Sequence, residues 1–85
     1  MVIGEHYSRT MTVFRKHEFK NRSKKNVWQI YMKDEDGKLY FTFTASKMLA
    51  TRLLRNLDKP VQMSFLVCSH SSDWDADVIK DIIFG

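Results

Sequence analysis

A β-hairpin is the sequence feature that most restricts how this chain can fold. Residues 27–44 contain two runs in which apolar and polar side chains alternate, joined by an Asp-Gly pair at positions 36–37. This pair between alternating runs is a strong hairpin signal, because glycine readily adopts the positive φ that a type I′ turn requires. With the pair at the centre of a two-residue turn, Tyr31 lies opposite Thr42. The turn therefore predicts both the hairpin and its register.

This register sorts the hairpin side chains onto two faces, because successive side chains of a strand point to opposite sides. The face predicted to be core carries Trp28, Ile30, Met32, Leu39, Phe41 and Phe43. The face predicted to be outside carries Gln29, Tyr31, Lys33, Tyr40, Thr42 and Thr44. Two aromatic rings beside a lysine and hydroxyl groups suit base stacking and phosphate contact. The alternative for the tyrosines is ordinary cross-strand packing on a solvated face.

Length and composition indicate one ordered domain of 85 residues. A chain of this length forms only one domain, which excludes a multidomain enzyme. It buries only about 60–65% of its unfolded surface, so its core must be small. A hydrophobic content of 44% and an aromatic content of 13% favour a globular domain over a disordered basic tail. The sequence has no apolar run near the roughly 20 residues of a membrane span and no secretion signal, and Cys68 is its single cysteine. We therefore expect a soluble, cytoplasmic protein that makes no membrane contact.

The net charge of +4 is unevenly distributed along the chain. Residues 1–26 hold seven Lys or Arg against two Glu, whereas residues 61–85 hold one Lys against four Asp. The loop just before the hairpin contains Arg22, Lys24 and Lys25. A basic loop next to an aromatic face favours a polyanionic ligand, and a solvated surface loop is the simpler alternative.

Hydrophobic periodicity predicts five strands and one helix. The strands are expected at residues 7–19, 27–34, 38–45, 61–68 and 76–84. A bulge is expected near Phe14, where the alternation changes phase. Leucines at intervals of four predict a helix over residues 47–57 with Ser46 as its N-cap. The last segment is rich in β-branched residues and favours a strand, although its isoleucines also match a helical stripe.

Three strands, a helix and two further strands form the element order of the OB fold, a five-stranded Greek-key barrel. We therefore predict an all-β domain with one helix, a single OB fold over residues 1–85 with the helix between strands three and four. The passage 43–63 joins an apolar strand, Ser46, Lys47, an Ala/Leu-rich helix and a lysine-bearing turn. This passage resembles bacterial and phage single-stranded DNA-binding proteins, and the segment 77–82 resembles their final strand.

That resemblance implies a protein that binds single-stranded DNA in replication or in a mobile element. The sequence ends at Gly85 without the acidic tail typical of that family. The tryptophan platforms of the family are matched only by Trp28, which the predicted register places inside. A tailless accessory similar to the small primosomal OB proteins therefore fits better than a general strand-binding protein.

An OB barrel presents its second and third strands to the ligand, between the loop after strand one and the loop before the last strand. The predicted nucleic-acid-binding residues are Tyr31, Tyr40, Lys33, Thr42, Arg22, Lys24, Lys25 and Trp74. The aromatic side chains would stack on bases, the cations would meet phosphates, and the threonine would hydrogen-bond a base or a sugar. Lys38, at the hairpin turn, is also assigned to phosphates. For Trp74, a lid over the barrel end is an equal alternative.

No residue pattern predicts catalysis, a metal site or a cofactor site. Cys68, His70, Asp73 and Asp75 combine one thiol with one imidazole and match no established zinc spacing. The chain has only three glycines and no glycine-rich phosphate loop. We therefore expect a non-enzymatic protein without a cofactor, whose partner is single-stranded DNA or RNA.

The alternative function is a protein-interaction module that docks on a polymerase, primase, helicase or host protein, with weak nucleic-acid binding or none. Leu66, Trp74 and the outward isoleucines of residues 76–84 would leave apolar surface on a monomer of this size. A partner protein or a homodimer would cover that surface. The pattern does not distinguish DNA from RNA, because no element recognisably reads the 2′-hydroxyl.

Overall fold

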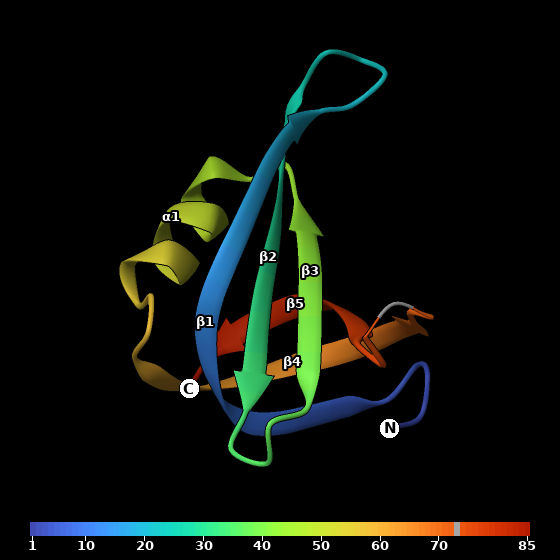
Figure 1. Cartoon of the computed structure of the whole chain (residues 1–85), viewed down its shortest axis with the longest axis vertical. Helices are drawn as coiled ribbons and strands as arrows, with labels where there is room; N and C mark the ends of the chain where they lie inside the picture. The colour runs from blue at the N-terminus through green and yellow to red at the C-terminus, as the bar shows by residue number, and fades with distance from the viewer. Residues whose placement is uncertain (73) are drawn as a thin grey trace.

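The computed structural model describes residues 1–72 and 74–85, in which five strands and one helix follow the predicted order (Figure 1). The elements are β1 (His6–Lys20), β2 (Asn26–Asp34), β3 (Leu39–Thr44), α1 (Lys47–Arg55), β4 (Pro60–His70) and β5 (Asp77–Phe84). The strands close into a barrel in the order β1-β2-β3-β5-β4, with β4 pairing back onto β1 and β3 parallel to β5. The predicted OB-like barrel is therefore confirmed, and its last segment is a strand.

β1 belongs to both halves of the barrel because it changes direction at a bulge. Its first half pairs with β4 and its second half pairs with β2, and the register on β2 shifts between Val13 and Arg15. The predicted bulge is thus confirmed. Its extra residue, Phe14, shares a side of the sheet with Arg15, since both contact the ring of Tyr31.

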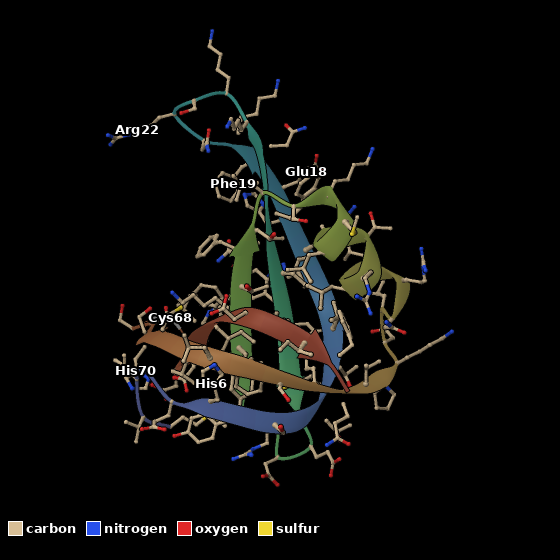
Figure 2. The ribbon with its side chains drawn as sticks, turned by 180° about the vertical axis from the view of Figure 1, so that it is seen from behind. His6, Glu18, Phe19, Arg22, Cys68 and His70 are labelled. Carbon is tan, nitrogen blue, oxygen red and sulfur yellow. The ribbon has the colours of Figure 1, made fainter. Side chains whose placement is uncertain are left out.

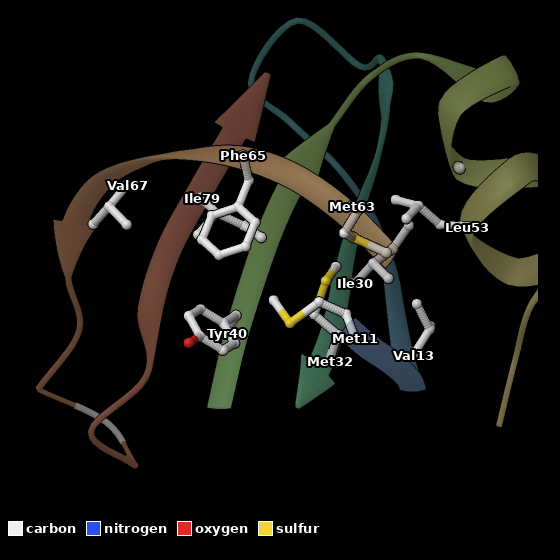
Figure 3. Close-up of a cluster of buried hydrophobic side chains, with 11 residues drawn as sticks. Met11, Val13, Ile30, Met32, Tyr40, Leu53, Met63, Phe65, Val67 and Ile79 are labelled. Carbon is white, nitrogen blue, oxygen red and sulfur yellow. The ribbon is translucent and has the colours of Figure 1, made fainter. Parts of the chain in front are cut away.

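The barrel interior is filled by apolar side chains from every strand and from α1 (Figure 3). The core consists of Met11, Val13, Ile30, Met32, Tyr40, Ala50, Leu53, Met63, Phe65, Val67 and Ile79. Leu53 comes from α1 and lies at one end of this cluster, whereas Tyr40 and Phe65 lie toward the other. Burial of a large apolar side chain contributes about 1.5–3 kcal/mol, so this cluster is the main source of stability.

α1 begins where the sequence predicts and ends earlier. The Oγ of Ser46 accepts a hydrogen bond from the backbone N–H of Leu49 at 3.2 Å, which confirms the predicted N-cap. The helix ends at Arg55 rather than at Leu57, because Leu57 forms a bridge with Val13 of β1 instead. In the described part of the chain, no helix has the length and apolarity of a membrane span.

The turn between β2 and β3 is one residue longer than predicted. The N–H of Gly37 donates to the carbonyl of Asp34 at 3.1 Å, and the N–H of Asp34 donates to the carbonyl of Lys38 at 3.0 Å. The carboxylate of Asp34 also accepts from the N–H groups of Asp36 and Lys38. These bonds stabilise a three-residue loop, residues 35–37, in place of the two-residue turn.

The longer loop reverses the two faces of β3, because a shift of one residue turns every side chain to the other side. Tyr31 lies opposite Phe41 rather than opposite Thr42. Tyr40 and Thr42, predicted to be outside, are only 0% and 2% exposed, whereas Phe43, predicted to be core, is 48% exposed. The predicted orientation of β3 is therefore wrong, and that of β2 is correct.

Candidate nucleic-acid interface

Aromatic side chains cover the outer surface of β1, β2 and β3. We call this set the aromatic face; its members are Phe14, Phe19, Tyr31, Phe41, Phe43 and, from the β4–β5 loop, Trp74. Successive ring centroids from Trp74 through Tyr31, Phe41 and Phe43 to Phe19 are 5.5, 5.6, 5.4 and 6.3 Å apart. An unbroken series of ring contacts thus runs from the β4–β5 loop to the far end of β1.

Trp74 and Phe43 are the most accessible members of the aromatic face. Trp74 is 57% exposed and Phe43 is 48% exposed, whereas Phe41 between them is covered by its neighbours. Large exposed apolar side chains that cluster on one surface often mark an interaction site. The two accessible rings offer free π-surface on which a flat ligand can stack.

A pocket of about 150 Å³ opens in the aromatic face beside Trp74. It is lined by Gln29, Tyr31, Phe41, Ser71 and Trp74. Pockets for drug-sized ligands measure about 300–1,000 Å³, so this one suits a single flat ring system. The side-chain amide of Gln29 forms no hydrogen bond within the described part of the chain, so it can pair with a polar edge of that ring system.

Two cations lie over the rings. The guanidinium carbon of Arg15 is 5.7 Å from the ring centroid of Tyr31 and 5.9 Å from that of Trp74. The ammonium of Lys33 is 6.0 Å from the ring centroid of Phe14. Neither cation forms an ion pair with a carboxylate among the described residues. Their charge is therefore available to a bound phosphate.

The basic loop extends the aromatic face beyond the barrel. Asn21 organises this loop, because its Oδ1 accepts from the N–H groups of Ser23 and Lys25 at 2.9 and 3.1 Å. Arg22, Lys24 and Lys25 are exposed. Arg22 projects outward from this loop (Figure 2). None of these three cations is ion-paired with another described residue. The positively charged loop predicted from the sequence is therefore present and exposed.

The carboxylates of β1, β2 and the β2–β3 turn lie away from the rings of the aromatic face, whereas Asp75 is exposed next to Trp74. Glu18 lies on the α1 side of β1, opposite Phe19 (Figure 2). Asp34 points inward, where its Oδ2 accepts from the hydroxyl of Tyr40 at 2.8 Å. Glu35 and Asp36 are in the β2–β3 turn, at the other end of the hairpin from the basic loop (Figure 1). The acidic turn therefore lies away from the Phe43 and Phe19 end of the aromatic face.

Tyr40 has a structural position instead of the predicted binding position. Its hydroxyl lies in the barrel end, bonded to Asp34 and 3.6 Å from the sulfur of Met1. Burial, followed by the hydrogen bond to the Asp34 carboxylate, raises the pKa of Tyr40 above its usual range. Neither Tyr40 nor Thr42 can contact a ligand on the outer surface, because both side chains are inside the barrel.

The structure brings together three of the predicted residues, Tyr31, Lys33 and Trp74, and places the three loop cations at one end of the same surface. The sequence reasoning missed five members of this surface: Phe14, Arg15, Phe19, Phe41 and Phe43. Two signals could have found them. An Asp three residues before a glycine favours the longer turn, and a bulge turns two successive residues to one side.

Cys68 and His70, considered above as metal ligands, contact residues of β5 instead. The thiol of Cys68 donates to the carbonyl of Val78 at 3.1 Å, and the Nδ1 of His70 is 2.6 Å from the Oδ1 of Asp77. Among the described residues, no three His, Cys, Asp or Glu side chains are grouped to hold a metal ion. Asp73, considered with them from the sequence, lies outside the described residues.

Comparison of the chain with protein-family models, with curated proteins and with solved structures gives no match. The class of protein is therefore defined by its own geometry: an OB-like barrel with an aromatic outer face and a basic loop. The resemblance to single-stranded DNA-binding proteins stays a prediction from the sequence.

Proposed function

We propose that this protein binds single-stranded nucleic acid, DNA in preference to RNA, across the aromatic face and the basic loop. It has no catalytic role in this proposal and serves as an accessory in replication or in a mobile element, as the resemblance to single-stranded DNA-binding proteins implies. The observation that carries the proposal is the unbroken series of rings flanked by cations without carboxylate partners among the described residues.

The orientation of β3 supports a ligand on this surface. The fold turns Phe41 and Phe43 outward and buries Thr42, although the apolar pattern alone favours the opposite arrangement. Such conflicts between local pattern and tertiary structure concentrate at functional sites, where stability is given up for binding. Bases that stack on aromatic side chains gain about 1–3 kcal/mol each and are accepted with little regard to sequence. We therefore expect weak base selectivity.

The cations around the aromatic face predict that binding depends on salt concentration. Five cations border the aromatic face, namely Arg15, Lys33, Arg22, Lys24 and Lys25. If about three or four of them contact phosphates, the logarithm of the affinity falls with the logarithm of salt concentration at a slope of roughly −2 to −3 for a single strand. Duplex DNA binds more weakly, because its bases are already stacked and cannot reach the rings.

Fluorescence anisotropy with labelled single-stranded DNA, single-stranded RNA and duplex DNA tests the proposal. Phe43→Ala and Trp74→Ala should each lower the affinity for single strands by about 5- to 150-fold, the loss of one stacked base. Met48→Ala is the matched control, because Met48 is 77% exposed on α1, outside the aromatic face. Binding independent of salt, or full affinity in both ring variants, would overturn the proposal.

The second candidate function is a protein-interaction module. Met48 and Ile83 are 77% and 67% exposed and lie outside the aromatic face, so a protein partner or a second copy has apolar surface to cover. Co-purification followed by light scattering separates the candidates. A stable complex with a replication enzyme, together with no oligonucleotide binding, favours the interaction module. A monomer that binds single strands favours the first proposal.

A further inference from the structure

The loop that carries Trp74 is tied to the barrel by a cluster of charged side chains. Asp77, at the start of β5, is only 3% exposed. Its Oδ1 is 2.6 Å from the Nδ1 of His70, and its Oδ2 is 3.6 Å from the Nζ of Lys38. The same Nζ donates a hydrogen bond to the backbone carbonyl of Asp75 at 3.2 Å. Lys38, the residue before β3, therefore contacts both Asp75 in the loop and Asp77 at the start of β5.

The backbone of this loop needs such support. Trp74 and Asp75 have φ values of 63° and 51°, in the left-handed region that costs non-glycine residues energy. This conformation persists where surrounding contacts hold it. The N–H of Ser71 donates to the carbonyl of Ala76 at 2.8 Å and closes the base of the loop. The Lys38 contact holds the loop at Asp75, directly beside the residue whose ring packs on Tyr31.

Asp77 in turn holds Lys38 in place. The Oδ2 of Asp77 is buried and has no hydrogen-bond partner among the described residues. His70 lies against the other oxygen, Oδ1, and the Lys38 ammonium at 3.6 Å is the cation beside Oδ2. A buried carboxylate oxygen with no partner is costly, so moving the Lys38 ammonium away from Oδ2 and out to a phosphate is unfavourable. Lys38 differs in this respect from Lys33, which is exposed and has no carboxylate partner among the described residues.

We propose that Lys38, held by Asp77, is a positioning residue that fixes the β4–β5 loop and keeps Trp74 packed against Tyr31. Lys38 itself contacts no phosphate, contrary to the prediction from the sequence. Its effect on ligand affinity rests on the proposed function, whereas its effect on the position of Trp74 does not.

Lys38→Met tests this role, with Lys33→Met as the matched control on the same hairpin. Acrylamide quenching of tryptophan fluorescence reports the position of Trp74 once the signal of Trp28 is subtracted with a Trp74→Phe variant. Lys38→Met should increase the quenching of Trp74 and lower single-strand affinity without changing the salt slope. Lys33→Met should leave the quenching unchanged and reduce the slope by about 0.7, the contribution of one phosphate contact to a single strand.

A double variant separates positioning from direct contact. In the Trp74→Ala background, Lys38→Met should cause no further loss of affinity, because the ring that Lys38 positions is gone. If Lys38→Met alone fails to fold because the Oδ2 of Asp77 loses its counter-charge, Lys38→Met with Asp77→Asn removes both charges, and circular dichroism confirms the fold. This double variant should also show increased acrylamide quenching of Trp74.

Unchanged Trp74 quenching in a folded Lys38 variant would overturn the proposal. So would a reduced salt slope together with an affinity loss that adds to that of Trp74→Ala. If the wild-type protein binds no oligonucleotide, the proposed function fails, and the quenching measurement still decides the role of Lys38.

Discussion

Replacing Tyr40 by Phe tests the register of the β2–β3 hairpin, because the substitution removes one hydroxyl and keeps the buried ring. That hydroxyl donates to the Oδ2 of Asp34 at 2.8 Å. The Oδ1 of Asp34 accepts from the N–H groups of Asp36 and Lys38, at 2.9 and 3.0 Å. The bond from Tyr40 therefore connects the barrel interior to the turn that sets the register.

The expected loss of stability follows from the type of bond and its surroundings. A hydrogen bond to a charged acceptor contributes about 1.5–3 kcal/mol to the free energy of unfolding. Asp34 is only partly buried, so water replaces part of the lost bond, and the lower value of about 1.5 kcal/mol is expected. For a domain of this size each kcal/mol shifts Tm by about 4–8 °C, which gives a decrease of about 6–12 °C.

Urea and thermal unfolding followed by circular dichroism measure this loss. The urea midpoint should fall while the m-value stays constant, because the surface exposed on unfolding is unchanged. Tyr31→Phe is the matched control, since it removes the same atom from a tyrosine on the aromatic face and should change stability by less than about 0.5 kcal/mol. Equal losses in the two variants, or a larger loss for Tyr31→Phe, would refute the assigned register.

Two further predictions concern the same hairpin. Because the pKa of Tyr40 is raised in the folded protein, the unfolded chain loses this proton first, near pH 10, and stability should fall as pH rises above about 10. Urea unfolding across this range should show a smaller decline for Tyr40→Phe, and parallel curves would contradict the assignment. Gly37 has a φ of 83° with no atom within 4 Å of an added Cβ, so Gly37→Ala should lose about 1 kcal/mol from backbone strain alone. Gly37→Asn should lose less, and a Gly37→Ala variant as stable as the wild type would show that the turn has another conformation.

The sequence predicted the elements of this fold because their signals are local. Alternation marks each strand, the change of phase near Phe14 marks the bulge, and Ser46 before the leucine-rich segment marks the helix start. The order of these elements then restricts the topology to very few arrangements, of which the OB-like barrel is one. The end of α1 was predicted two residues late, because the bridge of Leu57 to Val13 is a tertiary contact.

The register of β3 could not be read from its own residues. Leu39, Phe41 and Phe43 favour one face as core, while Tyr40 on the other face is also large enough to fill the barrel. The choice depends on the Asp34 carboxylate, which bonds both the turn and the Tyr40 hydroxyl. A local pattern contains no information on such a side-chain contact, and an error of one residue exchanges the two faces.

For the candidate site, the sequence by itself determined that Tyr31 and Lys33 lie outside and that a basic loop precedes the hairpin. Only the tertiary structure decided that Phe41 and Phe43, rather than Tyr40 and Thr42, complete the surface. It also placed the Lys38 ammonium beside the Asp77 carboxylate. The physical reason is that strand alternation is a property of neighbouring residues, whereas burial and charge pairing depend on residues brought together by the closed barrel.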